Sequence, residues 1–155
     1  MQKALAAFAA ILLTVGVARA QDIGAAKPDE AAAKLLIANE RALLDAVAKA
    51  DTPAFESLVL LSDGIWVMKD GFLLMRQLSP TLEVFKLTKW DIVNPRVTWL
   101  SEGSAIVNYV WTGTGTLFDQ PVAPVQSAVT VWTRRNGKWL AVSHQQTEVV
   151  NPGAR

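Results

Sequence analysis

The sequence contains no cysteine, one histidine and one tyrosine among its 155 residues. Without cysteine it can form neither a disulfide framework nor a thiolate that acts as nucleophile or metal ligand. One imidazole with scattered carboxylates also falls short of the roughly three or four ligands that an ordinary zinc site needs. We therefore expect no metal site and no cofactor, and a fold that depends on its hydrophobic core.

A glycine-rich phosphate loop is also missing from the sequence. Gly113 and Gly115 follow a run of strand-forming residues but do not open a helix, and the later glycine and lysine of such a loop do not occur. Glycine inside a strand is typical of a bend or a bulge. We predict that structural role for this pair.

Residues 1–20 have the pattern of an export signal. Lys3 gives a positively charged start, Ala4–Val17 is a run of apolar or small residues, and Ala18–Ala20 has the small-x-small form that signal peptidase accepts. The run is shorter than the roughly 20 apolar residues that span a bilayer. We predict cleavage after Ala20 and a periplasmic or secreted protein that the membrane no longer holds.

Charge is scarce and nearly balanced in the rest of the chain. Loss of Lys3 and Arg19 with the leader changes the formal net charge from +1 to −1. Such a surface gives no electrostatic reason to expect a nucleic-acid partner. We divide the chain into the signal peptide (1–20), a lead-in with the helix start (21–33), one folded domain (34–148) and a tail (149–155).

A core-packing helix is predicted at the start of the domain. Asp29 can cap a helix that begins near Glu30. Leu36, Leu43 and Val47 then share one face. The charged residues fall mostly elsewhere on this helix: Glu40, Arg41, Asp45 and Lys49.

A short second helix follows. Thr52 is a candidate N-cap, and Pro53 suits the first turn, where its missing N–H has no partner in any case. Asp63 and Gly64 would end this helix. The part around Arg76–Glu83 could be a third short helix or an irregular crossing.

The periodicity changes to that of strands after Gly64. Asp70-Gly71 and Asn136-Gly137 are hairpin turn signals. The strand candidates are residues 65–68, 72–75, 84–93, 97–100 running into 104–113, 125–134 and 138–147. Helices followed by strands predict an α+β domain with helices on one face of a curved antiparallel sheet.

Two stretches of the sequence resemble a known family. The first places Glu40 and Leu43-Leu44 before Asp51 and Ala54-Phe55, and the second, residues 129–147, reads VTVWTRRNGKWLAVSHQQT. Over residues 34–148 the chain resembles the SnoaL-like and domain of unknown function 4440 branch of the nuclear transport factor 2-like superfamily.

This resemblance implies a cone-shaped α+β domain, commonly a homodimer, whose curved sheet wraps a long helix and leaves a pocket at its open end. It implies no single function, because the fold carries isomerases, dehydratases, cyclases, assembly modules and immunity proteins.

Candidate catalytic residues are few. Enzymes of this fold that isomerise or dehydrate ring ketones use a carboxylate base with tyrosines or a second acid, whereas this chain offers Tyr109 alone. An acid–base pair could combine His144 with Asp63 or Asp91, because imidazole titrates near neutrality and a carboxylate fixes its tautomer. A lone histidine at a strand end is more often a structural hydrogen-bond donor, so both roles stay open for His144.

All six tryptophans lie in strand candidates. Alternation places Trp139 and Gln145 on one face of the last strand and Leu140 and His144 on the other. Strands that are apolar on both faces indicate helices on one face and a partner subunit on the other, which favours a homodimer. The tryptophans can belong to the core and the dimer interface. The alternative is a ligand pocket, for which the candidate lining residues are Trp66, Tyr109, Trp111, Trp139 and Gln145.

Three functional hypotheses follow. The first is an exported domain that binds a small, largely apolar molecule without catalytic machinery. The second is an isomerase or dehydratase that uses His144 with an aspartate. The third is a dimeric structural or interaction module without a ligand, which a cone filled by side chains would favour.

Overall fold

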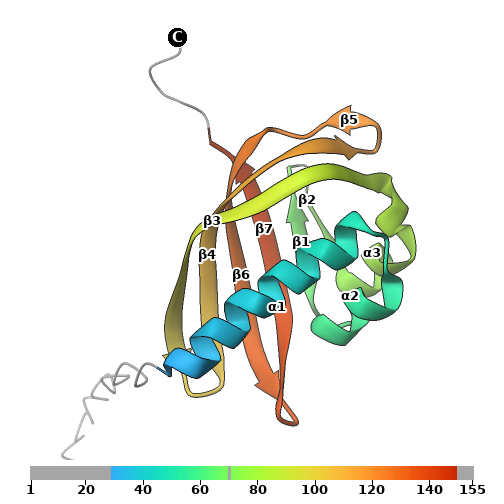
Figure 1. Cartoon of the computed structure of the whole chain (residues 1–155). Coiled ribbons are helices and arrows are strands. Elements are labelled where there is room, and N and C mark those ends of the chain that lie inside the picture. The colour runs from blue at the N-terminus through green and yellow to red at the C-terminus, as the bar shows by residue number, and fades with distance from the viewer. Residues whose placement is uncertain (1–28, 70, 150–155) are drawn as a thin grey trace, which may run out of the picture.

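The computed structural model describes residues 29–69 and 71–149. The expected signal peptide, most of the lead-in and most of the tail lie outside the described residues. A strongly curved sheet wraps around helix α1, Glu30–Ala48, which crosses its concave face (Figure 1). Two shorter helices lie at the end of the sheet where α1 ends (Figure 1).

Helix α1 begins where its cap predicts. The Asp29 side chain accepts a hydrogen bond of 3.1 Å from the Ala32 N–H, which satisfies one of the free donors of the first turn. The buried face of the helix includes Glu40, which is 0% exposed. Our expectation that Glu40 lies mostly off the apolar face is therefore wrong. Leu36, Glu40 and Leu44 follow one another at intervals of one helical turn, so they share that face.

The second helix, α2, spans Thr52–Leu58. Its N-cap is Asp51, which accepts from the Ala54 N–H at 3.0 Å, and not Thr52 as expected. The helix also ends earlier than Asp63, because Val59 already has extended backbone and bridges to Ala141. Beyond it the chain returns to the sheet.

Residues after Gly64 form a hairpin and a helical crossing. Strands β1 (Ile65–Met68) and β2 (Gly71–Leu74) pair antiparallel, as predicted. The crossing consists of α3 (Met75–Leu78) and the 3₁₀ helix η1 (Ser79–Val84). Of the two alternatives for the part around Arg76–Glu83, a third short helix or an irregular crossing, the structure shows helix.

The long strands are β3 (Phe85–Ser101), β4 (Ser104–Leu117), β6 (Val125–Arg135) and β7 (Lys138–Glu148), and a short β5 (Gln120–Pro121) pairs with β4. The strand order is β2-β1-β7-β6-β4-β3. All neighbours are antiparallel except β1 and β7, which makes the sheet mixed. The predicted α+β class with a curved sheet around the N-terminal helix is confirmed.

Strand β3 joins two segments that we expected to be separate. Its register with β4 shifts between Val93 and Arg96, where Asn94 has a φ of 52°. A second shift lies opposite Gly113 and Gly115. A Cβ on Gly113 would lie 2.5 Å from the Lys89 carbonyl oxygen, so the strands approach too closely there for any side chain. The extra residue is Thr88 of β3, so the glycines lie opposite a bulge and do not form it themselves.

The β6–β7 hairpin turns at Asn136-Gly137, where both φ angles are positive (50° and 81°), as its sequence predicts. Beyond the turn a bulge changes the alternation. Val131 pairs with Ser143 and Trp132 with Ala141, so β7 has one extra residue. Trp139 therefore shares the concave face with His144. Our assignment of these two residues to opposite faces is wrong.

No helix among residues 29–69 and 71–149 has the length and apolar character needed to cross a bilayer.

Candidate functional site

A buried carboxylate forms the centre of the polar side chains inside the cone. Glu40 Oε1 accepts hydrogen bonds from the Tyr109 hydroxyl at 2.9 Å and the Thr130 hydroxyl at 2.7 Å. Its other oxygen, Oε2, accepts from the Trp132 indole N–H at 2.9 Å. Helix α1 thus contributes the acceptor, and β4 and β6 contribute three donors from the concave face of the sheet.

His144 joins this network through Thr130. The Thr130 Oγ1 atom lies 2.8 Å from His144 Nδ1, and Glu40 Oε1 lies 3.6 Å from the same nitrogen. Within the described residues, His144 is the only basic side chain within 4 Å of the Glu40 carboxylate. Hydrogen bonds or a positive charge must compensate a buried carboxylate for its lost hydration. Thr130 supplies a hydrogen bond to Glu40, and His144 can supply a positive charge.

The hydrogen bonds determine which His144 nitrogen carries a proton. An ionised carboxylate can only accept, so the single proton of the Thr130 hydroxyl is directed to Glu40. Thr130 must then accept from His144, and Nδ1 carries a hydrogen. His144 Nε2 is left as an acceptor in the neutral ring or as a donor in the charged ring.

Aromatic side chains enclose the imidazole. The Trp66 ring lies against it, with ring centroids 3.9 Å apart and planes inclined by 34°. Phe55 and Phe85 pack beside Trp66, with centroid distances of 6.3 and 6.0 Å. The imidazole therefore has an aromatic surface on its Trp66 side.

Three buried nitrogen atoms meet no hydrogen-bond partner among the described residues: Trp111 Nε1, His144 Nε2 and Gln146 Nε2. We call them the inner nitrogens. Register places all three side chains on the concave face, because His144 pairs with Thr130, Gln146 with Ala128 opposite Tyr109, and Trp111 is two residues beyond Tyr109. Polar atoms of this kind are the places where a ligand or a water molecule could bind.

Burial raises the pKa of Tyr109 well above its ordinary value, and the adjacent Glu40 charge adds to that increase. The Gln146 amide lies near enough to the phenol to act in the opposite direction, although its N–H₂ group does not reach hydrogen-bond geometry. Tyr109 is therefore a neutral donor to Glu40 under ordinary conditions.

The structure does not bring the two predicted aspartates to His144. Asp91 is exposed and pairs with Arg41 at 2.8 Å, which lowers the pKa of Asp91. Asp63 is exposed after the end of α2 and accepts from the Ser62 hydroxyl at 2.9 Å. The carboxylate beside His144 is Glu40, which the sequence pattern did not place inside.

The predicted ligand-binding residues divide between the two faces. Trp66, Tyr109 and Trp111 are buried on the concave face with His144, and Trp139 lies near the hairpin end beside Trp99. Gln145 is exposed on the opposite face, where its amide donates to Thr147 at 3.3 Å. Gln146 takes the inner position.

Four residues of the network lay outside our site predictions: Glu40, Thr130, Trp132 and Gln146. A signal for Glu40 exists in the sequence, since it lies four residues from both Leu36 and Leu44. Thr130 and Trp132 alternate with valines on β6, and only the bulge in β7 determines which of their partners face inward.

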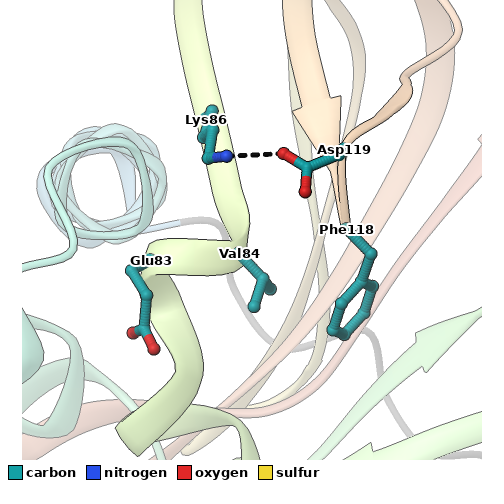
Figure 2. Close-up of a pocket in the computed structure, with 5 residues that line it drawn as sticks. All are labelled: Glu83, Val84, Lys86, Phe118 and Asp119. Carbon is teal, nitrogen blue, oxygen red and sulfur yellow. Dashed lines mark hydrogen bonds and ion pairs between the residues drawn. The ribbon is translucent and has the colours of Figure 1, made fainter.

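Two surface hollows of the described chain lie outside this network. One open depression of about 470 Å³ is lined by Glu83, Val84, Lys86, Phe118 and Asp119. Figure 2 shows Lys86 and Asp119 joined across its rim by an ion pair of 2.5 Å. A second, of about 360 Å³, lies between the helices and the β6–β7 turn. In contrast, Glu40, Thr130 and His144 of the network are 0% exposed.

No group of three histidine, aspartate or glutamate side chains that could hold a metal ion occurs in residues 29–69 and 71–149. The chemistry available in the network is hydrogen bonding and proton transfer.

No family model matches the chain, and no curated protein matches its sequence. Solved structures do share its fold. A nuclear transport factor 2-like protein from Cytophaga hutchinsonii superposes with a TM-score of 0.69 at 14% identity, covering 79% of this chain and 100% of that one.

Two further neighbours come from different functional classes. A proposed dehydratase of the nuclear transport factor 2-like family from Streptomyces avermitilis has a TM-score of 0.64 at 13% identity, covering 78% of this chain and 98% of its own. The association domain of C. elegans CaMKII has a TM-score of 0.62 at 16% identity, with coverages of 76% and 95%.

The chain therefore has the nuclear transport factor 2-like fold, as its resemblance implied. At such identities the likeness shows the fold and leaves the function to the site. Membership of the domain of unknown function 4440 branch stays a prediction.

Proposed function

We propose that the protein is an exported domain that binds a small, partly apolar molecule at the concave face of its sheet. The observation that supports this function is the set of inner nitrogens on Trp111, His144 and Gln146. A buried polar atom without a partner destabilises a fold by about 1–3 kcal/mol. A bound molecule with polar groups would supply the missing hydrogen bonds and recover that free energy.

The surroundings of these nitrogens favour a ligand with an apolar part. Trp66 covers the His144 ring, and Phe55 and Phe85 extend the aromatic surface. Ligand sites typically combine such surfaces with a few polar groups that fix orientation.

Entry of a ligand requires movement, because His144 and Trp111 are 0% and 1% exposed. The β1–β2 hairpin covers His144 on its Trp66 side and has only a short attachment to the sheet. Strand β1 is joined to β7 by a short register of Ile65 to Ser143, Trp66 to His144 and Val67 to Gln145. Opening of this hairpin would expose His144 on its Trp66 side.

Thermal unfolding with a library of small, partly apolar molecules tests the binding function. We expect some compounds to raise the melting temperature and to alter the emission of the buried tryptophans. Gln146→Leu should weaken this effect, whereas Gln145→Leu on the outer face should preserve it. The proposal fails if no compound acts, or if both variants respond alike.

An association module is the second candidate, and a specific observation favours it. Val125 and Val129 both lie on the outer face of β6 and are 41% and 36% exposed, which leaves apolar surface there uncovered in the single chain. A second copy that covers this face would form the homodimer expected from the two-sided apolar strands. Light scattering at micromolar concentration decides it, since a monomer mass would contradict the dimer.

The proposal that the protein is exported depends on the signal-peptide pattern of residues 1–20. Expression of the full chain in a Gram-negative host should yield periplasmic protein that begins at Gln21, as N-terminal sequencing would show. Full-length protein retained in the membrane would contradict this proposal.

A further inference from the structure

We propose that His144 and Gln146 bind the carboxyl group of a small carboxylic acid, with Glu40 and Thr130 as positioning residues that hold the His144 ring. This inference rests on the proposed function and specifies the ligand class of the same site.

The two side chains have the spacing that a carboxyl group can bridge. His144 and Gln146 are two residues apart on β7 and face the same side of the sheet. Successive side chains on one face of a strand are about 7 Å apart at their bases. Two hydrogen bonds of about 3 Å each, made to the two oxygens of one carboxyl group, span such a separation.

The fixed His144 ring supports the choice of a carboxyl group. With Nδ1–H donated to Thr130, the free nitrogen is Nε2. In the neutral ring Nε2 accepts the O–H of a carboxylic acid, and in the charged ring it donates to the carboxylate. One bound geometry therefore satisfies both positions of the proton.

Other polar groups satisfy this site less completely. A hydroxyl group can donate to one nitrogen and accept from the other, but with two hydrogen bonds of about 3 Å its single oxygen spans at most about 6 Å, less than the roughly 7 Å between the bases of the two side chains. A primary amide matches the site only while the ring is neutral, when its N–H₂ donates to Nε2 and its carbonyl accepts from Gln146. Against a charged ring, one donor of the amide would face a donor of the protein. The Trp111 N–H on the same face is a further donor for an oxygen of the ligand.

The positioning role is tested in the free protein by nitrogen NMR of the imidazole. The chain has one histidine, so the tag-free protein labelled at histidine shows a single ring. We expect Nδ1 to carry the proton in the wild type and to lose this preference in Thr130→Val. A neutral wild-type ring protonated at Nε2 would overturn the role of Glu40 and Thr130.

The ligand class is tested with acetate, propanoate and benzoate against acetamide, propanamide and benzamide. The His144 nitrogen resonances report binding at the site, and we expect the carboxylates to bind at least tenfold more tightly than the matched amides. Gln146→Leu should weaken carboxylate binding about tenfold, while Gln145→Leu should leave it unchanged. Melting curves of both variants establish that they are folded.

The outcomes separate this inference from the proposed function. Equal binding of acids and amides would overturn the carboxyl assignment and leave a small-molecule site. If no probe and no library compound moves the His144 resonances, and a crystal structure shows ordered water only on the inner nitrogens, both proposals fail.

Discussion

The concave face and the outer face of the same strands differ in the polarity and in the burial of their side chains. On the concave face, Tyr109, Thr130 and His144 are buried and linked to Glu40 by hydrogen bonds. One residue away along each strand, Asn108, Val129 and Gln145 form a row on the outer face. The inner row is polar but buried, whereas the outer row is partly apolar and consists of the exposed Val129 and Gln145 and the half-buried Asn108.

This difference shows that hydrophobicity alone does not distinguish inside from outside in this sheet. The inner polar groups remain buried because each donor of Tyr109, Thr130 and Trp132 finds an oxygen of Glu40. The outer valines Val125 and Val129 are partly exposed in the single chain. The inner face therefore bears on stability and on the proposed ligand binding, and the outer face on the proposed dimer.

Removal of the central acceptor should have the largest effect. In Glu40→Ala, the donors of Tyr109, Thr130 and Trp132 all lose their partner, and we expect a loss of about 3–5 kcal/mol in the free energy of unfolding. Urea denaturation followed by tryptophan fluorescence measures it. Glu30→Ala is the matched control, because Glu30 lies on the same helix in an exposed pair with Lys34. Equal stabilities of the two variants would show that the network contributes little.

Replacement of the imidazole should have a smaller effect. In His144→Gln, the amide can still donate to Thr130, so we expect a loss of about 1 kcal/mol in stability. Binding of carboxylate probes should disappear in this variant, because the glutamine lacks a group that exchanges a proton near neutrality. An unchanged melting temperature together with complete loss of an assayed reaction would instead support the enzyme hypothesis.

How much of this could be predicted from sequence depends on the kind of interaction. The caps, the hairpin turns and the order of helices and strands follow from local patterns, and they were predicted with few errors. Asp29, for example, caps α1 as expected. Glu40 was misplaced because a charged residue counts against burial until its partners are known. Those partners lie 69 to 92 residues away in sequence.

The faces of β7 could not be derived from alternation. A bulge changes the phase of the whole strand, so Trp139 and His144 share a face although they differ by an odd number of residues. Pairing of β6 with β7 determines the bulge, and the sequence of β7 alone contains no clear sign of it. The site was therefore predicted in part: His144 and Tyr109 belong to the network, while the aspartates and Gln145 lie outside it.

Alkaline pH distinguishes the inner tyrosine from an exposed one. The raised pKa of Tyr109 means that the folded state keeps the phenol proton after the unfolded state has lost its own. Stability from this group is complete below the ordinary pKa of tyrosine, near 10, and declines as the pH rises above it. Tyr109 is the only tyrosine, so its absorbance change should appear together with unfolding in an ultraviolet titration. Ionisation near pH 10 in the folded protein would contradict the burial of its hydroxyl.

The outer face should tolerate a charge with the smallest effect on folding. Val129 is 36% exposed in the single chain, so Val129→Lys should change the unfolding free energy of a monomer by only about 0.5 kcal/mol. If this face forms the dimer, the buried lysine of each copy would destabilise the interface, and light scattering should show monomers. Thr98→Lys offers a control on β3, at the margin of the same face and also exposed. A dimer that persists in Val129→Lys but not in the control would move the interface away from β6, and the inner-face variants above should leave the mass unchanged in either case.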